Sequence, residues 1–161
     1  MWTKQIRAVT VHDMKTLLLL LIALALFPLQ DAFSDSTSAT NKKTVIAFYE
    51  MAFNKHMPAE AMKQFGGDTY TQHNPFVTDG KKPFIDYFIK FQKEHPTAGT
   101  EIKRVLSDGN LVSVHAHSKV EPRDLGRAVM DIFRLEHGKI IEHWDVAQPV
   151  PEKSANTNTM F

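Results

Sequence analysis

The chain has 161 residues, no cysteine and a formal net charge of +1 at pH 7. This length suits one domain, and the lack of cysteine excludes both a disulfide scaffold and thiolate metal ligands. A near-neutral charge argues against a nucleic-acid-binding protein, which needs a basic surface.

The first part of the chain has the pattern of a secretory leader. A basic residue precedes an apolar run over residues 17–27, and Ala32 and Ser34 are small residues of the kind that a signal peptidase reads. The run is shorter than the about 20 residues that span a bilayer. We therefore expect a signal peptide over residues 1–34, with Met14 as an alternative start. A periplasmic or secreted protein without stable membrane association follows from this, and an uncleaved N-terminal anchor is the alternative.

Three helices are predicted after this leader. A polar linker is expected over residues 35–43, and apolar residues at helical spacing predict a first helix over residues 41–55. Proline at the start and glycine at the end delimit a second helix over residues 58–65. A third helix is predicted over residues 83–94. The intervening segment, "DTYTQHNPFVTDG", is rich in turn formers and is expected to be a loop.

The periodicity then changes from 3.6 to 2, which indicates strands. Four segments alternate in this way: "TEIKRVLS", "NLVSVHAHSKV", "RAVMDIFRLE" and "KIIEHWDVAQ". Helices followed by antiparallel strands predict an α+β domain. Residues 149–161 are polar and contain proline, so we expect a flexible tail.

Alternation along these strands also predicts which side chains share a face of the sheet. One register places a group of acidic and histidine residues together on the concave face. The group comprises His115, His117, Asp131, His143 and Asp145. The opposite register buries Val112, Val114 and Trp144 beneath the helices instead, and the sequence leaves both open.

The segments "TQHNP" and "GKIIEHWDV" resemble the SnoaL-like polyketide cyclases of the nuclear-transport-factor-2-like superfamily. The resemblance covers residues 44–148. It implies a cone-shaped (cystatin-like) α+β fold, in which three N-terminal helices pack on a curved, mostly antiparallel sheet of four to six strands. A small-molecule ligand or substrate inside the cone, no cofactor and a homodimer through the convex face of the sheet are expected with it.

By the same resemblance, Asp131 is expected to act as general acid/base, with His117 as its catalytic partner in the same pocket. The other residues expected to line this pocket are His73, His115, Phe133, His143 and Asp145. For His73 a structural role, pinning the turn before Pro75, is an equal alternative. A buried structural pair is the alternative for Asp131 and His117, and a packed, hydrogen-bonded core pair is the alternative for His143 and Asp145.

The expected chemistry is enolisation or intramolecular aldol closure of a small carbonyl compound, which needs a base and a donor for the enolate oxygen. A non-catalytic module that binds a small apolar ligand is the alternative, since one fold hosts both functions. A metal-dependent site is the third option, built from His115 and His117 with His143 or His73 and with Asp131. We expect no metal, because His-x-His on a strand is a weak signal.

Overall fold

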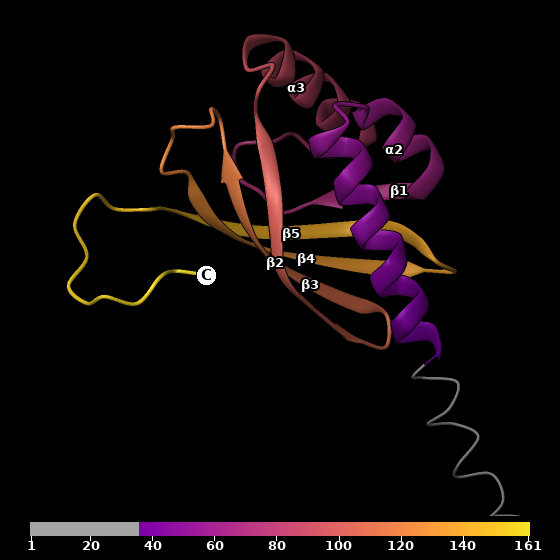
Figure 1. The fold of residues 1–161 in the computed structure, drawn as a ribbon. Helices are drawn as coiled ribbons and strands as arrows, with labels where there is room; N and C mark the ends of the chain where they lie inside the picture. Colours follow the sequence, from indigo (N-terminus) through magenta and orange to yellow (C-terminus); the bar gives the residue numbers. More distant parts are fainter. Residues whose placement is uncertain (1–35) are drawn as a thin grey trace, which may run out of the picture. The chain divides into compact units, whose positions relative to one another are not determined.

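The computed structural model describes residues 36–161 (Figure 1). The predicted signal peptide, its alternative start and the anchor lie outside the described residues. Residues 36–49 form a helix that continues as a π-helical turn, η1 (Glu50–Asn54). The other helices are α2 (Pro58–Phe65) and α3 (Lys81–Glu94). The strands are β1 (Gly66–Gln72), β2 (Gly99–Asp108), β3 (Leu111–Lys119), β4 (Arg127–Glu136) and β5 (Lys139–Pro149). Within residues 36–161, no helix has the length and apolar character needed to cross a membrane.

The five strands form one sheet in the order β1-β5-β4-β3-β2, with the helices on one of its faces (Figure 1). Neighbouring strands are antiparallel except β1, which runs parallel to β5. The predicted α+β fold with a mostly antiparallel sheet is therefore confirmed.

Two segments differ from the sequence-based expectation. Part of the expected loop before α3 is strand β1, which pairs with β5 at the edge of the sheet and buries Tyr70. The expected linker is helical over residues 36–43. Its helix is held by the β2–β3 turn, where the Asn41 side chain donates to the carbonyl of Gly109 at 3.0 Å and the Ser38 hydroxyl accepts the Gly109 N–H at 2.8 Å. Tertiary contacts thus override the weak helix propensity of a Ser/Thr-rich segment.

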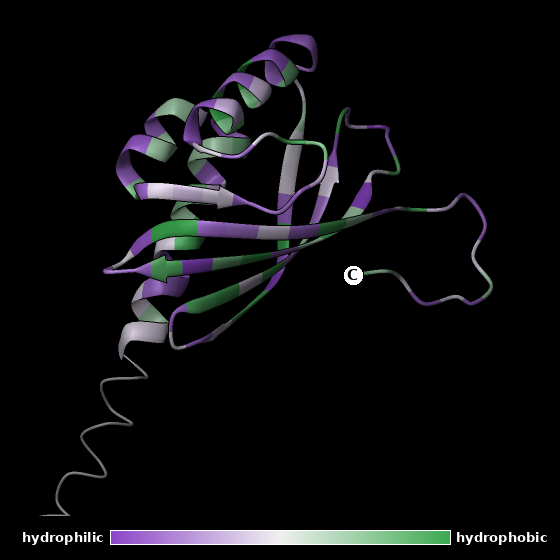
Figure 2. Ribbon diagram, turned by 180° about the vertical axis from the view of Figure 1, so that it is seen from behind, coloured by the Kyte–Doolittle hydropathy of each residue, from purple (hydrophilic) through white to green (hydrophobic). Residues whose placement is uncertain are grey.

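The hydrophobic core lies between the helices and the inner face of the sheet. Hydrophobic and hydrophilic residues alternate along the strands (Figure 2), as expected for a sheet with one covered face. Phe48 of the first helix is fully buried, and its ring lies 5.8 Å from the rings of both Phe84 in α3 and Phe133 in β4. This aromatic contact fixes two helices over the middle of the sheet.

The connection between β3 and β4 ends at Gly126, whose backbone conformation and surroundings both demand glycine. Its φ is +79°, and a Cβ there would lie 2.4 Å from the carbonyl oxygen of Ser118 and 2.8 Å from Nε2 of His117. We expect Gly126→Ala to lower the free energy of unfolding by the left-handed backbone cost, about 1–2 kcal/mol, plus a steric cost of about 1–3 kcal/mol. Urea unfolding of the purified protein measures the sum of the backbone cost and the steric cost.

Gly138→Ala is the matched control for this substitution. Gly138 has a similar φ of +73°, but a Cβ there would meet nothing within 4 Å. It should therefore carry the backbone cost alone. Equal losses in the two variants would show that the contact with β3 does not constrain Gly126.

Candidate functional site

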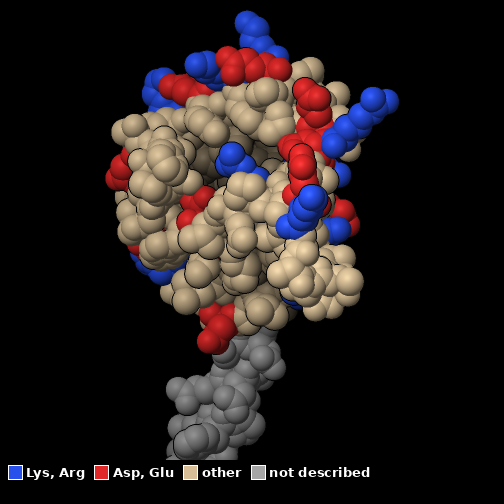
Figure 3. All heavy atoms as spheres, turned by 90° about the vertical axis from the view of Figure 1, so that its left-hand side faces the viewer, with Lys and Arg blue, Asp and Glu red and all other residues tan. Residues whose placement is uncertain are grey.

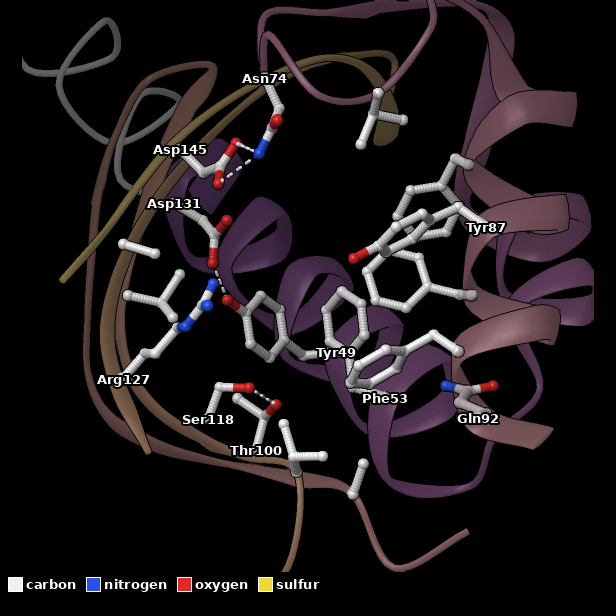
Figure 4. A pocket seen from close by; sticks show the side chains of 18 of the residues that line it. Tyr49, Phe53, Asn74, Tyr87, Gln92, Thr100, Ser118, Arg127, Asp131 and Asp145 are labelled. Atoms are coloured by element: carbon white, nitrogen blue, oxygen red, sulfur yellow. Dashed lines mark hydrogen bonds between the residues drawn. The ribbon is translucent and has the colours of Figure 1, made fainter. Parts of the chain in front are cut away.

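A cavity of about 430 Å³ lies between the helices and the concave face of the sheet. Cavities of this size accommodate small organic ligands. Figure 4 shows side chains of the sheet and of α3 pointing into it from opposite walls. The wall formed by the helices is aromatic, and its rings belong to Tyr49, Phe53, Phe84, Tyr87, Phe88 and Phe91.

The wall formed by the sheet carries polar residues among the apolar ones. Asp131 lies opposite Val114 of β3 on one side and Asp145 of β5 on the other, so all three share the concave face. One step along, Phe133 lies opposite His143. The structure thus places Asp131, Phe133, His143 and Asp145 in the cavity wall. Only one of the two registers that the sequence left open has Asp131, His143 and Asp145 on this face.

His117 and His115 do not belong to this wall. They alternate with the fully buried Val114 and Ala116, which places both histidines on the outer face of the sheet. Nε2 of His117 contacts the Leu125 carbonyl at 2.8 Å, and Arg104 donates to Nδ1 of His115 at 2.6 Å.

The expected pairing of His117 with Asp131 in one pocket is therefore wrong. Valines of β3 lie on the same concave face as Asp131. From the sequence, inward-pointing valines belong to one register and an inward-pointing Asp131 to the other, and the structure has both together. The two histidine rings instead contact the C-terminal Phe161, at 4.2 Å from His117 and 5.7 Å from His115.

His73 also lies outside the cavity, contrary to the expectation that it lines the pocket. Its Nε2 is 2.8 Å from Oε1 of Glu142, and its ring stacks on Trp144 at 4.7 Å. Glu142 accepts a second bond from Arg134 at 2.6 Å. The hydrogen bonds from His73 and Arg134 hold the pKa of Glu142 below its usual value. His73 therefore belongs to a charged cluster on the outer face.

The centre of the cavity wall is a buried hydrogen-bonded pair. Asp131 is 6% exposed, and its Oδ1 lies 2.8 Å from Nε2 of His143. Its other carboxyl oxygen accepts the hydroxyl proton of Tyr49 from the first helix. Burial raises the pKa of Asp131; the hydrogen bond and charge of His143 oppose this, and the charge of Asp145 adds to it.

The second nitrogen of His143 has a defined partner. Nδ1 lies 2.9 Å from Oε1 of Gln72, and the same Oε1 accepts the backbone N–H of Asn74 at 2.9 Å. An atom that accepts from a backbone N–H is the amide oxygen, so Nδ1 of His143 carries a hydrogen. Nε2 is then the nitrogen that forms the hydrogen bond with Asp131. The ring also stacks on Phe133 at 4.8 Å, which fixes its plane.

The second carboxylate of the wall is held in a different way. Nδ2 of Asn74 lies 2.8 Å from each carboxylate oxygen of Asp145 (Figure 4). Asp145 is half-buried, whereas Asp131 is buried. The two acids therefore face one another across β4 and β5 in different environments.

Three residues of the site were not among those the sequence predicted: Tyr49, Gln72 and Asn74. Tyr49 lies within the predicted first helix, at a position that helical spacing assigns to its apolar face, although a buried tyrosine hydroxyl requires a partner. Gln72 and Asn74 flank His73 in the quoted "TQHNP". They reach the site because β1 pairs with β5 beside His143, at Gln72↔His143.

The histidines proposed as metal ligands are divided between the two faces of the sheet. Within residues 36–161, no group of three or more His, Cys, Asp or Glu side chains is placed to hold a metal ion. The ligand set considered from the sequence is therefore not assembled.

Residues 45–143 match the family model of the SnoaL-like domain. No curated protein matches the sequence. Among solved structures, a candidate polyketide cyclase from Bacillus cereus is 20% identical with a TM-score of 0.58, over 67% of this chain and 74% of its own. A candidate ketosteroid isomerase from Kribbella flavida is 11% identical with a TM-score of 0.60, over 77% and 87%. An epoxide hydrolase from M. tuberculosis is 19% identical with a TM-score of 0.55, over 69% and 84%. These similarities show a shared fold.

Proposed function

Because the chain belongs to the SnoaL-like family, whose fold also occurs in proteins of different chemistry, we propose that it is an acid/base enzyme. It would move a proton next to the carbonyl group of a small molecule, without a cofactor, in a cyclisation of the aldol type or an isomerisation. The observation that carries this proposal is the buried Asp131, hydrogen-bonded to His143 and Tyr49 in the wall of a cavity.

The pair of Asp131 and His143 has one proton to share, because Nδ1 of His143 keeps its own hydrogen toward Gln72. Burial favours the neutral form, with the proton on the carboxyl. Transfer of this proton to Nε2 produces a carboxylate that the Tyr49 hydroxyl and the imidazolium stabilise. This carboxylate is a base of raised pKa, which matches the requirement of proton abstraction near neutral pH.

In the proposed step, the Asp131 carboxylate removes a proton from the carbon next to a carbonyl, and the electron pair of the C–H bond forms an enolate. Returning the proton to another carbon isomerises the substrate. Attack of the enolate carbon on a second carbonyl closes a ring, and the proton goes to the new alkoxide oxygen.

A hydrogen-bond donor for the developing enolate oxygen is available on the opposite wall. Tyr87 of α3 points into the cavity (Figure 4), and its hydroxyl has no partner within residues 36–161. Donors placed where charge develops lower the barrier of such reactions. Tyr87 therefore completes the set of groups that enolisation needs.

The test is proton exchange on 2-tetralone, a flat aromatic ketone with acidic α-protons. In D₂O, the protein should accelerate the loss of the α-proton signal in ¹H NMR above the buffer rate. Asp68→Asn, which changes an exposed aspartate outside the cavity, should retain this acceleration. Shifts of the cavity resonances on adding tetralone, without any acceleration of exchange, would contradict the enzyme and favour the non-catalytic binding module.

Two further parts of the proposal rest on the sequence and on the outer face of the sheet. The leader pattern of residues 1–34 supports export to the periplasm or medium.

Exposed apolar side chains on the outer face support a homodimer. Leu106 is 68% and Val146 is 71% exposed, and Met130 and Ile132 are each 39% exposed. Exposed apolar patches of this kind often mark protein contacts.

A further inference from the structure

Arg127 is a cation in the cavity wall that the proton-transfer step does not use. It is the first residue of β4 and shares the concave face with Asp131, because the two residues are four positions apart on the strand. At about 3.3 Å per residue, their backbones lie about 13 Å apart along the strand. Figure 4 shows the Arg127 side chain directed into the cavity.

Among the described residues, no carboxylate lies at hydrogen-bonding distance from this guanidinium. Within residues 36–161, the Arg127 side chain has no hydrogen bond or ion pair. Asp124 lies nearby in the preceding loop, and the charge of Arg127 contributes to lowering the pKa of Asp124, but the two oxygens of Asp124 accept the backbone N–H groups of Gly126 at 2.9 Å and Val120 at 3.2 Å rather than a bond from the guanidinium. The arginine is therefore available to an external anion.

Charge is distributed unevenly along the cavity wall. Its basic residues are Arg127 and Lys119, at the adjacent start of β4 and end of β3, where they outnumber the single acid Asp124. The acids Asp131 and Asp145 lie farther along the strands, with no basic residue of the lining beside them. The molecule is hollowed on the side drawn in Figure 3, where both basic and acidic side chains border the opening. An anionic group of a ligand is attracted to the Lys119–Arg127 end and repelled by Asp145 at the other.

The opposite wall favours a flat ring. Phe53 and Phe88 lie 5.0 Å apart, and the rings of Tyr87 and Phe91 stack at 6.2 Å with an interplanar angle of 7°. Aromatic ligands pack against such rings with a gain beyond that of buried area.

We propose that the cavity takes an aromatic carboxylate, with its carboxylate group on Arg127 and its ring on the aromatic wall. The planar guanidinium matches a carboxylate with two parallel hydrogen bonds, which an uncharged polar side chain does not reproduce. This inference deepens the proposed function, since the part of the ligand away from the carboxylate then faces Asp131. The substrate class would be ring compounds that carry both a carboxylate and an enolisable carbonyl.

The experiment compares 2-naphthoate with the uncharged 2-naphthamide by isothermal titration calorimetry on the full chain. The wild type should bind the carboxylate about tenfold or more tightly than the amide, as expected for one charged hydrogen-bonding partner. In Arg127→Gln this preference should disappear while the amide affinity stays unchanged. Arg123→Gln, at an exposed position outside the cavity lining, should keep the preference.

Equal affinities in the wild type, a preference that survives in Arg127→Gln, or no binding of either compound would each overturn the inference. These results are distinguishable from failure of the proposed enzyme, because binding is measured without turnover. A preference that depends on Arg127, in a protein that does not exchange the protons of 2-tetralone, would identify an anion-binding module without acid/base activity.

Discussion

Replacing Asp131 with asparagine is expected to slow the exchange of 2-tetralone α-protons by about 10²–10⁴-fold, the usual contribution of a general base. The amide keeps the shape of the carboxyl and both of its contacts. It can donate to Nε2 of His143 and accept from Tyr49, as the neutral acid does. It cannot accept a proton from carbon. Initial exchange rates measured by NMR at several pH values test this directly, and a rate equal to that of the wild type would remove Asp131 from the mechanism.

The stability of the same variant separates lost chemistry from lost folding. Burial raises the pKa of Asp131 in the folded protein. Below the unfolded-chain pKa, about 3.9, the carboxyl is neutral in both states. As the pH rises above that value, the unfolded chain releases its proton first, so the wild type loses stability up to the folded pKa. Asparagine does not titrate.

Urea unfolding from pH 4 to pH 7 should therefore show the stability of Asp131→Asn rising relative to that of the wild type. At neutral pH the variant should be at least as stable as the wild type. A wild type that instead gains stability over the variant as the pH rises would show that Asp131 is ionised and well solvated in the folded state.

The second large effect is expected from Phe48→Ala, which should lower the free energy of unfolding by about 3–5 kcal/mol. The side chain is fully buried, and its ring contacts those of Phe53, Phe84 and Phe133. Truncation loses the transfer free energy of the ring and leaves a cavity that three separate elements border. Urea unfolding at a fixed pH measures the loss.

Phe76→Ala provides the matched control, because Phe76 is 91% exposed. Its stability should stay within about 0.5 kcal/mol of the wild type. A loss below about 1 kcal/mol in Phe48→Ala would mean that the helices collapse onto the vacated space.

The sequence predicts most of the helices and four of the five strands because their apolar residues recur regularly, with the 3.6-residue period of a helix or the two-residue period of a strand. It does not predict β1, since Gly66–Gln72 is short and rich in glycine and polar residues, and its strand character depends on pairing with β5 about 70 residues later. Pairing between segments that are distant in the sequence gives little strand signal in the local sequence of either segment.

The site is predicted only in part for a related reason. Alternation shows that Asp131 shares a face with Phe133, and that His143 shares a face with Asp145. The phase of β3 relative to β4 comes from the hydrogen-bonding register, and it is this register that brings Val114 rather than His115 beside Asp131. Alternation along the strands does not predict Tyr49 as a site residue, because Tyr49 lies on the first helix and reaches Asp131 from there.

The parallel pairing of β1 with β5 has a consequence for the order of events during synthesis. Gln72 and Asn74 leave the ribosome long before His143 and Asp145, their partners at the other end of the domain. The nascent chain therefore carries an unpaired sheet edge and an incomplete site until its last strand emerges. A chain that ends before β5 lacks His143 and Asp145, so the proposed acid/base activity requires a polypeptide whose translation has passed this strand.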